Sequence, residues 1–367
     1  MNNISQIDEN FKIETKINKP DIKFLNARNT PFKIYGIFHE NGKFRRMPEA
    51  VACRVSDGVR FLHSNTAGGR VIFKTDSPYV AVHAKMTNIG KMPHFTLAGS
   101  AGFDVYLRNV KTGKSEKYFA TLVPPYDMTD GYEGVVDFGD SKMKEVVINF
   151  PLYSDVTELY IGISKNSTLT APNDYETELP IVYYGSSITQ GGCASRPGMS
   201  YQSILSRKLN ANYINLGFSG NAKAEDEMIN YIKDLEMCAF VFDYDHNAPS
   251  VEHLEKTHEK MFKAIREKNP TLPIIMMPRP KFELTKEEKR REKIIKATYK
   301  NALKNGDKNV YFLSASSLTA LAERDGTVDN CHPTDLGFYS MAVALYPTLK
   351  KILKSQQKAQ RKNNENI

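Results

Sequence analysis

Hydrophobic and polar residues follow different patterns in the two halves of the chain. Before Asn173, apolar residues recur at every second position, as at Val80, Val82, Ala84 and Met86, which is the spacing of a strand with one buried face. Clusters of Gly, Asp, Asn and Pro separate such runs and are typical of turns. The pattern predicts an N-terminal antiparallel β-sandwich, with further strands near residues 70–74, 103–107, 118–122, 134–138, 145–150 and 159–163.

After Asn173, short apolar runs alternate with longer stretches of helical spacing. The runs predict buried strands at residues 181–184, 212–216, 240–242, 274–277 and 310–312. The stretches between and after them predict helices at residues 201–209, 226–235, 251–267, 286–303 and 336–353. Thr285 and Glu288 form a capping-box pattern at the start of one helix, and residues 304–306 supply a stop. This alternation predicts a five-stranded parallel sheet with helices on both faces.

A polar stretch with a proline, residues 166–174, separates the two patterns. A chain of 367 residues is long enough for two domains, each with its own core. We therefore expect a β-sandwich domain over residues 1–174 and an α/β domain over residues 175–367. The tail after about residue 355 is expected to be frayed.

The formal net charge of +8 does not by itself indicate a nucleic-acid-binding protein. The basic excess lies in mixed-sign helical stretches such as residues 286–300 and in the tail after Lys350. Because no basic stripe is interleaved with aromatic residues, a solvated surface accounts for the pattern better. We expect no nucleic-acid partner.

Residues 1–20 lack the continuous apolar core of a secretory signal, and no other stretch is long and apolar enough to span a membrane. The four cysteines, Cys53, Cys193, Cys238 and Cys331, are too few and too scattered for a disulfide framework. These features predict a cytoplasmic protein with no membrane partner. The sequence does not indicate the oligomeric state.

Four short polar segments carry the candidate chemistry: residues 185–189, 217–221, 245–247 and 329–333. The first three each follow one of the predicted buried strands. In an open parallel sheet, ligands collect beyond the carboxyl ends of the strands, where loops and helix N-termini present free backbone donors. We therefore expect these segments to converge on one site.

The residue types in these segments are those of a serine hydrolase. Ser187 would be the nucleophile, His332 its base, and Asp329 the group that orients the imidazole, since an Asp three residues before a His can reach its Nδ1 while Nε2 faces the nucleophile. The backbone N–H groups of Ser187 and Gly220 and the side chain of Asn247 would form the oxyanion hole.

Each segment taken alone has a simpler interpretation as an ordinary turn, a helix cap or an exposed loop. Their joint occurrence at the predicted strand ends favours catalysis. The chain has no Gly-x-Ser-x-Gly motif, phosphate-binding loop, dinucleotide fingerprint or metal-ligand spacing. We expect no cofactor and no metal.

These segments resemble the signature blocks of the SGNH hydrolases, or GDSL-like esterases and lipases, whose named residues correspond here to Ser187, Gly220, Asn247 and His332, with Asp329 completing the triad. The first block departs from the usual Gly-Asp-Ser, because Ser186 precedes the nucleophile. In the N-terminal half, residues 102–106 read Gly-Phe-Asp-Val-Tyr, similar to the Gly-x-Asp-Leu-Tyr signature of a β-sandwich module that precedes certain SGNH domains. The resemblance implies a flavodoxin-like three-layer α/β/α hydrolase domain after the sandwich.

The resemblance further implies a serine esterase that works through an acyl-enzyme and removes short acyl groups, such as acetyl, from a carbohydrate or related small molecule. Arg196 follows the nucleophile block and is a candidate contact for the substrate. Cys193 and Cys331 each lie near a catalytic segment and are candidates for a contact across the site. Three other functions remain open: an acyltransferase, a lysophospholipase or thioesterase, and a non-catalytic carbohydrate-binding protein.

Overall fold

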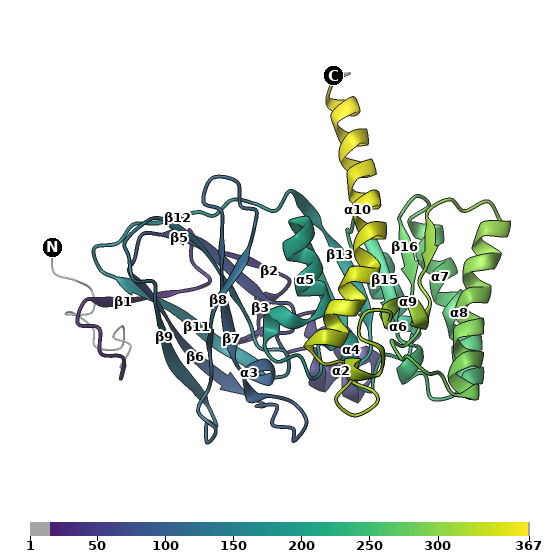
Figure 1. The fold of residues 1–367 in the computed structure, drawn as a ribbon, viewed down its shortest axis with the longest axis horizontal. Coiled ribbons are helices and arrows are strands. Elements are labelled where there is room, and N and C mark those ends of the chain that lie inside the picture. The colour runs from purple at the N-terminus through teal and green to yellow at the C-terminus, as the bar shows by residue number, and fades with distance from the viewer. Residues whose placement is uncertain (1–14, 366–367) are drawn as a thin grey trace.

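The computed structural model describes residues 15–365, with side chains through residue 359. Most of residues 1–20, where the sequence shows no secretory signal, lies outside the described residues. Figure 1 shows a strand-rich N-terminal half beside a C-terminal half in which helices cover a central sheet. The predicted order of a β-sandwich followed by an α/β domain is confirmed.

The sandwich consists of two antiparallel sheets. The first has the strand order β1 (Ile22–Asn26), β11 (Asp155–Ser164), β6 (Tyr79–Thr87) and β9 (Gly131–Asp137). The second has the order β12 (Leu169–Thr170), β5 (Arg70–Thr75), β10 (Lys144–Asn149), β7 (Phe103–Arg108) and β8 (Lys117–Leu122), with β2 (Lys33–Tyr35) also paired to β5. Val80, Val82, Ala84 and Met86 all lie in the core between the sheets, as their alternation predicts.

The C-terminal half contains a five-stranded parallel sheet. Its strand order is β14 (Ala211–Gly217), β13 (Thr177–Gly185), β15 (Ala239–Asp243), β16 (Ile274–Met276) and β17 (Val310–Phe312). Because side chains alternate along a strand, Ile181 and Tyr183 belong to the core on one face, and Val182 and Tyr184 to the core on the other. The sheet is therefore buried on both faces, which explains its continuous apolar strands.

Helices cover both faces of this sheet. α5 (Tyr201–Leu209) and α10 (Asp335–Glu365) pack on one face, and α6 (Asp226–Lys233), α7 (Val251–Lys268) and α8 (Lys286–Lys304) on the other. The capping box of Thr285 and Glu288 is present at the start of α8. The remaining short helices of this half are α4 (Ser187–Gln190), η3 (Pro197–Met199), η4 (Asp245–Asn247), α9 (Ala315–Leu318) and η5 (Glu323–Gly326).

The end of the chain differs from the sequence prediction. Fraying was expected after about residue 355, whereas α10 continues through Glu365 and projects beyond the rest of the molecule in Figure 1. The side-chain amide of Gln356 donates a hydrogen bond to the carbonyl of Cys238 at 2.7 Å. This contact attaches α10, beyond its predicted end, to the residue that precedes the central strand β15.

The N-terminal half also contributes short elements that the sequence did not predict. They are β3 (Phe38–Glu40), β4 (Lys43–Arg45), α1 (Glu49–Val55), α2 (Asp57–Leu62) and α3 (Leu97–Ser100). Ala52 of α1 and Val59 and Leu62 of α2 are buried with the residues of the parallel sheet, not with those of the sandwich. The division at residue 174 stays a prediction, but these helices lie before it and help cover the α/β sheet.

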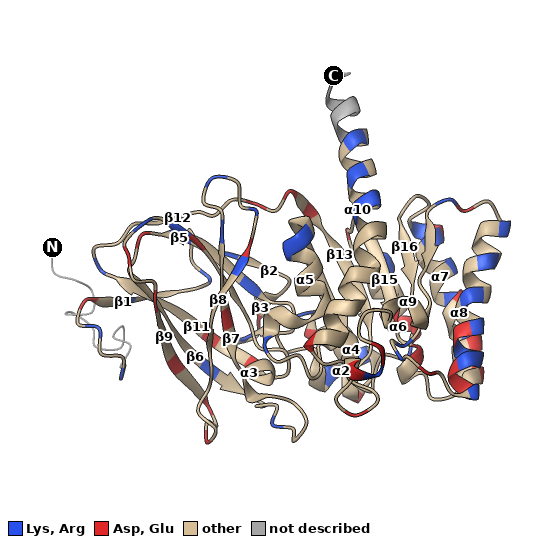
Figure 2. Ribbon diagram, viewed as in Figure 1, with Lys and Arg blue, Asp and Glu red and all other residues tan. Residues whose placement is uncertain are grey.

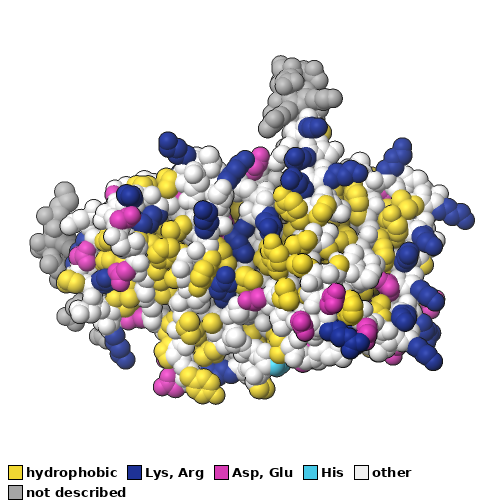
Figure 3. All heavy atoms as spheres, viewed as in Figure 1, with side chains coloured by type: hydrophobic (Ala, Val, Ile, Leu, Met, Phe, Trp, Pro, Cys, Tyr) yellow, Lys and Arg dark blue, Asp and Glu magenta, His cyan; other side chains and the backbone are white. Residues whose placement is uncertain are grey.

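The charged residues are distributed as the sequence indicated. Figure 2 shows Lys and Arg alternating with Asp and Glu along α8, and Figure 3 shows basic side chains scattered among acidic and apolar ones on the face in view. Over the described part of the chain, the helices are too short or too polar to cross a lipid bilayer.

Candidate active site

Three of the four polar segments start at neighbouring positions on the carboxyl edge of the parallel sheet. Gly185 at the end of β13 pairs with Gly217 of β14 on one side and with Asp243 of β15 on the other. The loops that follow these strands therefore leave the sheet side by side. This is the edge where open parallel sheets bind their ligands.

Ser187 is the first residue of α4, directly after β13. The hydroxyl of Ser186 caps this helix by accepting a hydrogen bond from the N–H of Ile188 at 3.2 Å. A serine therefore fills the capping position where the Gly-Asp-Ser form of the motif has a carboxylate. The departure noted in the sequence removes a charge but preserves the helix cap.

A buried carboxyl group supports the turn beneath Ser187. Asp243 lies at the end of β15 and accepts a hydrogen bond from the Thr189 hydroxyl in α4. A Cβ atom at Gly185 would lie 1.7 Å from Asp243 Oδ1, so only glycine fits at that position. Burial raises the pKa of Asp243 to about 7. No motif in the sequence marked this residue.

The fourth polar segment brings His332 to Ser187. The Oγ atom of Ser187 lies 3.0 Å from Nε2 of His332, and Nδ1 of the same ring lies 2.8 Å from Oδ2 of Asp329. The other oxygen of Asp329 accepts hydrogen bonds from the backbone N–H groups of Cys331 at 3.0 Å and His332 at 2.7 Å. Hydroxyl, imidazole and carboxylate thus follow one another in hydrogen-bonding order.

The groups around His332 shift its pKa upward. Its hydrogen bond with the Cys331 thiol, followed by that with Asp329, raises the pKa of His332 to about 9, against the opposing effect of burial. Burial raises the pKa of Cys331, but hydrogen bonds with His246 and His332 outweigh it and bring that pKa to about 6. At Asp329 the hydrogen bonds from His332 likewise outweigh burial and lower the pKa to about 2. The surroundings therefore favour a protonated imidazole between two anions.

The candidate oxyanion donors lie on the loops after β13, β14 and β15. The N–H of Ser187 opens α4, where the helix itself supplies no acceptor. Gly220 adopts a left-handed conformation with φ of +69° in the loop after β14. Oδ1 of Asn247 accepts a hydrogen bond from the N–H of Ala222 at 3.3 Å, which leaves the Nδ2 amino group as the free donor of that side chain.

The chain matches two family models. Residues 178–350 match the GDSL-like lipase/acylhydrolase family, and residues 22–169 match the N-terminus of esterases of the SGNH hydrolase type. The crystal structure of a GDSL-like lipase from Bacteroides ovatus is 30% identical, with a TM-score of 0.81 over 91% of this chain and 98% of that one. This chain belongs to the GDSL-like lipase/acylhydrolase family. It is a carboxylic ester hydrolase with an SGNH-type fold, as the resemblance of its motifs predicted.

Two more distant structures share the fold of this GDSL-like hydrolase. A salicylyl-acyltransferase from a tetracycline biosynthetic pathway is 18% identical, with a TM-score of 0.71 over 89% of this chain and 96% of that one. A family two carbohydrate esterase from Cellvibrio japonicus is 14% identical, with a TM-score of 0.58 over 91% of this chain and 98% of that one. No match was found among curated proteins.

Besides Asp243, two residues that position the site in this GDSL-like hydrolase were not found from the sequence. The side chain of Gln190, at the end of α4, accepts a hydrogen bond from the N–H of Ser219 at 3.0 Å and so ties the nucleophile helix to the Gly220 loop. The hydroxyl of Tyr153 donates to the carbonyl of Ser187 at 3.1 Å. Gln190 could have been found from the sequence, because it lies one helical turn after Ser187. No motif near Tyr153 indicated a role in the site.

Arg196 contacts the sandwich. Its guanidinium lies 4.1 Å from the centre of the Tyr118 ring and 3.9 Å from the carboxylate of Asp104. Asp104, the acid of the Gly-Phe-Asp-Val-Tyr motif, is fully buried and accepts hydrogen bonds from Asn149 at 2.8 Å and from the N–H of Gly198 at 2.8 Å. These contacts place Arg196 between the two halves of the chain, and its role in substrate binding stays a prediction.

Side chains from separate segments also gather around His332 in an arrangement that could hold a metal ion. The ligand atoms of His94, Cys193 and His332 lie within 4.8 Å of one another, and so do those of Asp329, Cys331 and His332. Both thiols are free, and imidazole and thiolate are ligands that suit Zn²⁺. His94 and Cys193 meet His332 only in the fold, so no sequence spacing marked the first group, whereas the second lies within one loop. The expectation of an enzyme without metal or cofactor stays a prediction.

Proposed function

We propose that this hydrolase is a serine esterase that removes short acyl groups, acetyl in the first instance, from hydroxyl groups of a carbohydrate or related small molecule through an acyl-enzyme. The observation that carries the proposal is the hydrogen-bonded series from Ser187 Oγ to His332 Nε2 at 3.0 Å and from His332 Nδ1 to Asp329 Oδ2 at 2.8 Å. Nucleophile, base and orienting acid have this order in serine hydrolases.

In the first half of the reaction, Nε2 of neutral His332 takes the hydroxyl proton of Ser187 as Oγ attacks the carbonyl carbon of the ester. Asp329 stabilises the resulting imidazolium through the hydrogen bond to Nδ1. As the tetrahedral intermediate collapses, the bond from the carbonyl carbon to the alcohol oxygen breaks, and His332 gives its proton to that oxygen. The alcohol leaves and the acyl group stays on Ser187.

The oxyanion of the tetrahedral intermediate would be held by the N–H groups of Ser187 and Gly220 and by Nδ2 of Asn247. The hydrogen bond from Ala222 to Oδ1 of Asn247 supports this role, because it turns the amino group of the side chain outward as a donor. In the second half, water gives a proton to His332 and attacks the acyl carbon. The bond from the acyl carbon to Ser187 Oγ then breaks, His332 returns the proton to Oγ, and the carboxylic acid leaves.

Structural relatives support the choice of substrate. Besides the Cellvibrio enzyme, a family two carbohydrate esterase from Clostridium thermocellum has been solved in complex with cellohexaose, and an acetyl xylan esterase from Butyrivibrio proteoclasticus shares the fold. Each aligns with this chain over nearly its whole length. An ester of a polyhydroxylated alcohol is therefore the substrate class that we favour over a lipid.

The proposal is tested with Ser187→Ala. We expect this variant to lose nearly all hydrolysis of p-nitrophenyl acetate and all covalent labelling by a fluorophosphonate, because the nucleophile is absent. Ser316→Ala, which changes an exposed serine of α9, serves as the matched control and should retain both. Labelling that persists in Ser187→Ala would assign the nucleophile to another residue.

The same assay separates hydrolysis from acyl transfer. Adding methanol or glycerol to the reaction should leave acetate as the main product if water is the preferred acceptor. Predominant formation of the new ester would identify an acyltransferase, and a rate that rises with acyl chain length would identify a lipase-like or thioesterase-like enzyme. Sugar binding without any ester cleavage would favour the carbohydrate-binding alternative.

A further inference from the structure

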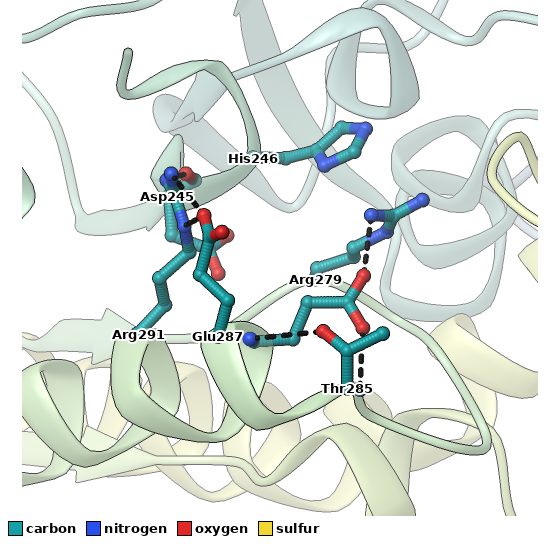
Figure 4. A pocket seen from close by; sticks show the side chains of 7 residues that line it. Asp245, His246, Arg279, Thr285, Glu287 and Arg291 are labelled. Atoms are coloured by element: carbon teal, nitrogen blue, oxygen red, sulfur yellow. Dashed lines mark hydrogen bonds and ion pairs between the residues drawn. The ribbon is translucent and has the colours of Figure 1, made fainter. Parts of the chain in front are cut away.

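A small polar pocket lies beside the proposed catalytic loop. It has a volume of about 260 Å³ and is formed by η4 after β15, by Arg279 after β16 and by the first turn of α8. Figure 4 shows Asp245 and His246 on one side of it, and Arg279, Thr285, Glu287 and Arg291 around the rest. Every lining side chain is polar, so the pocket is unsuited to an acyl chain.

Most of the charges in this pocket are already paired. Arg279 Nη1 lies 2.6 Å from Glu288, and Arg291 Nη2 lies 2.9 Å from Glu287. The guanidinium of Arg291 also donates to the carbonyl of Asp245 at 2.6 Å. These pairs fix the walls of the pocket. Among the described residues, Asp245 is the acid of the lining that forms no ion pair, although the nearby His246, Arg291 and Arg279 favour its charged form.

Two buried polar atoms of the lining are without a hydrogen-bond partner in the part of the chain that the structure describes. They are Oδ1 of Asp245, a residue only 3% exposed, and Nε of Arg279. A buried acceptor or donor that is left unsatisfied costs about 1–3 kcal/mol, so such atoms in a cavity are expected to have a partner when the cavity is filled.

The oxygen of Asp245 and the nitrogen of Arg279 need opposite hydrogen-bond partners, and this limits which ligands could satisfy both. Oδ1 of Asp245 needs a donor, whereas Nε of Arg279 needs an acceptor. An ammonium group would satisfy only the first, and a carboxylate or phosphate only the second while being repelled by Asp245. Hydroxyl groups both donate and accept, so a neutral ligand with several hydroxyls satisfies both atoms.

The pocket is connected to the catalytic loop on the side of His332. Arg279 Nη2 donates to the carbonyl of Asn330 at 3.4 Å, and Nε2 of His246 lies 3.0 Å from Sγ of Cys331. On the other side, η4 carries both Asp245 and the proposed oxyanion donor Asn247. A substrate held at Ser187 thus has this pocket next to the residues that contact its reacting ester.

We propose that this pocket is the subsite for the alcohol part of the substrate, and that it binds the hydroxyl groups of a neutral polyol, a sugar ring being the type example, through Asp245 and Arg279. The inference rests on the proposed function and makes it more specific. Asp245 and Arg279 act here as specificity residues that hold the leaving alcohol, while the bond-breaking groups remain those described above.

The test compares two acetate esters that differ only in the alcohol. Monoacetylated methyl glucosides carry free hydroxyls, whereas phenyl acetate carries none. In Asp245→Ala and Arg279→Lys, we expect the ratio of kcat/KM for the glucoside ester to that for phenyl acetate to fall by roughly 10-fold or more, since a site built for hydroxyl groups discriminates strongly once its partners are lost. Asp245→Asn, which keeps an acceptor oxygen, should restore part of the ratio.

Asp234→Ala and Arg290→Lys are the matched controls, because both change exposed residues of the same types away from the pocket. In these controls the ratio of kcat/KM for the glucoside ester to that for phenyl acetate should stay within about twofold of the wild-type value, well below the roughly tenfold fall expected of the pocket variants. Thermal melting monitored by circular dichroism verifies that each variant is folded. A ratio that stays unchanged in both folded pocket variants would overturn the inference while leaving the serine esterase mechanism intact.

A binding measurement that needs no turnover separates the two proposals. Saturation-transfer NMR on Ser187→Ala should detect methyl glucoside, and the signal should disappear when Asp245→Ala is added. If the wild type cleaves neither ester, the proposed function is wrong. The binding measurement alone then tests whether the pocket binds a neutral polyol. Stronger binding of glucosamine than of methyl glucoside would overturn the assignment to neutral hydroxyl groups in favour of an ammonium ligand.

Discussion

The carboxylate of Asp104 in β7 accepts a hydrogen bond from the N–H of Gly198 in η3 at 2.8 Å. One residue of the sandwich thereby holds the segment that follows the nucleophile helix. The ring of Tyr106, two residues further along β7, packs so closely on Gly198 that a Cβ there would lie 2.3 Å from the Tyr106 hydroxyl. The Gly-Phe-Asp-Val-Tyr motif therefore acts as a docking surface between the halves of the chain.

We predict that Asp104→Ala lowers the free energy of unfolding by about 2–3 kcal/mol, because it removes a buried acceptor and leaves the Asn149 amide and the Gly198 N–H unpaired. Urea denaturation monitored by fluorescence measures the change. Asp130→Ala, at an exposed position, should alter the unfolding free energy by about 0.5 kcal/mol or less. Equal stability of Asp104→Ala and the wild type would show that the motif does not hold the halves together.

Asn247→Ala should reduce kcat for p-nitrophenyl acetate by roughly 10²–10³-fold, the effect of removing one preorganised oxyanion donor. The melting temperature should remain close to that of the wild type, since within the described residues this side chain has one hydrogen bond, a long one from the N–H of Ala222 at 3.3 Å. Asn301→Ala on the exposed surface of α8 is the control. Undiminished turnover in Asn247→Ala would remove this residue from the oxyanion hole.

Cys331 sets the pH dependence of the proposed base. His332 must be neutral to accept a proton, and its pKa of about 9 is raised first by the Cys331 thiol, so activity of the wild type should increase as the pH rises through about 9. In Cys331→Ala this cause is gone, the pKa of His332 falls, and the ascending limb of the profile of kcat/KM should move to lower pH.

The measurement for Cys331→Ala is a profile of kcat/KM from pH 5 to 10, with Cys53→Ala as a control that changes an exposed thiol. Because the neutral imidazole becomes more abundant, activity at pH 7 should exceed that of the wild type. An unchanged ascending limb would mean that the thiol does not influence the proton on His332.

Arg46 should be a major determinant of stability. It is almost completely buried, donates to the carbonyls of Leu62 at 2.6 Å and Gly217 at 2.6 Å, and lies over the Phe218 ring at 4.8 Å. We predict that Arg46→Ala lowers the free energy of unfolding by about 2–4 kcal/mol, because the buried carbonyls of Leu62 and Gly217 lose their donor. Urea denaturation tests this, and a loss below about 1 kcal/mol would contradict it.

Much of the fold follows from patterns within single segments. The strand that leads to Ser187 and the capping box of Thr285 are encoded by neighbouring residues, so periodicity and capping rules find them. α1 and α2 were missed because each is too short, at 7 and 6 residues, to show a helical period, and their burial depends on a sheet formed much later in the chain. These helices are stabilised by tertiary packing, and the helix propensity of their own residues does not predict it.

In the candidate site, too, contacts between neighbouring residues could be predicted and contacts between distant segments could not. The spacing of Asp329 and His332 on one tight loop predicted their contact, because only Asn330 and Cys331 lie between them and limit where the two side chains can go. The contact of His246 with Cys331 joins two loops that are distant in sequence, so no local pattern marked it. The same holds for Tyr153, which reaches the nucleophile helix from the other half of the chain.

The packing of α1 and α2 on the parallel sheet has a consequence for how this protein can be divided. A chain that began at residue 175 would retain all five strands of that sheet and the proposed catalytic residues, yet the apolar cluster that contains Leu216 and Phe218 would lose Val59 and Leu62. The shortened protein would expose this apolar surface to water, and we expect it to aggregate. The N-terminal half is therefore expected to complete a core of the α/β half, so that the two halves fold as one unit.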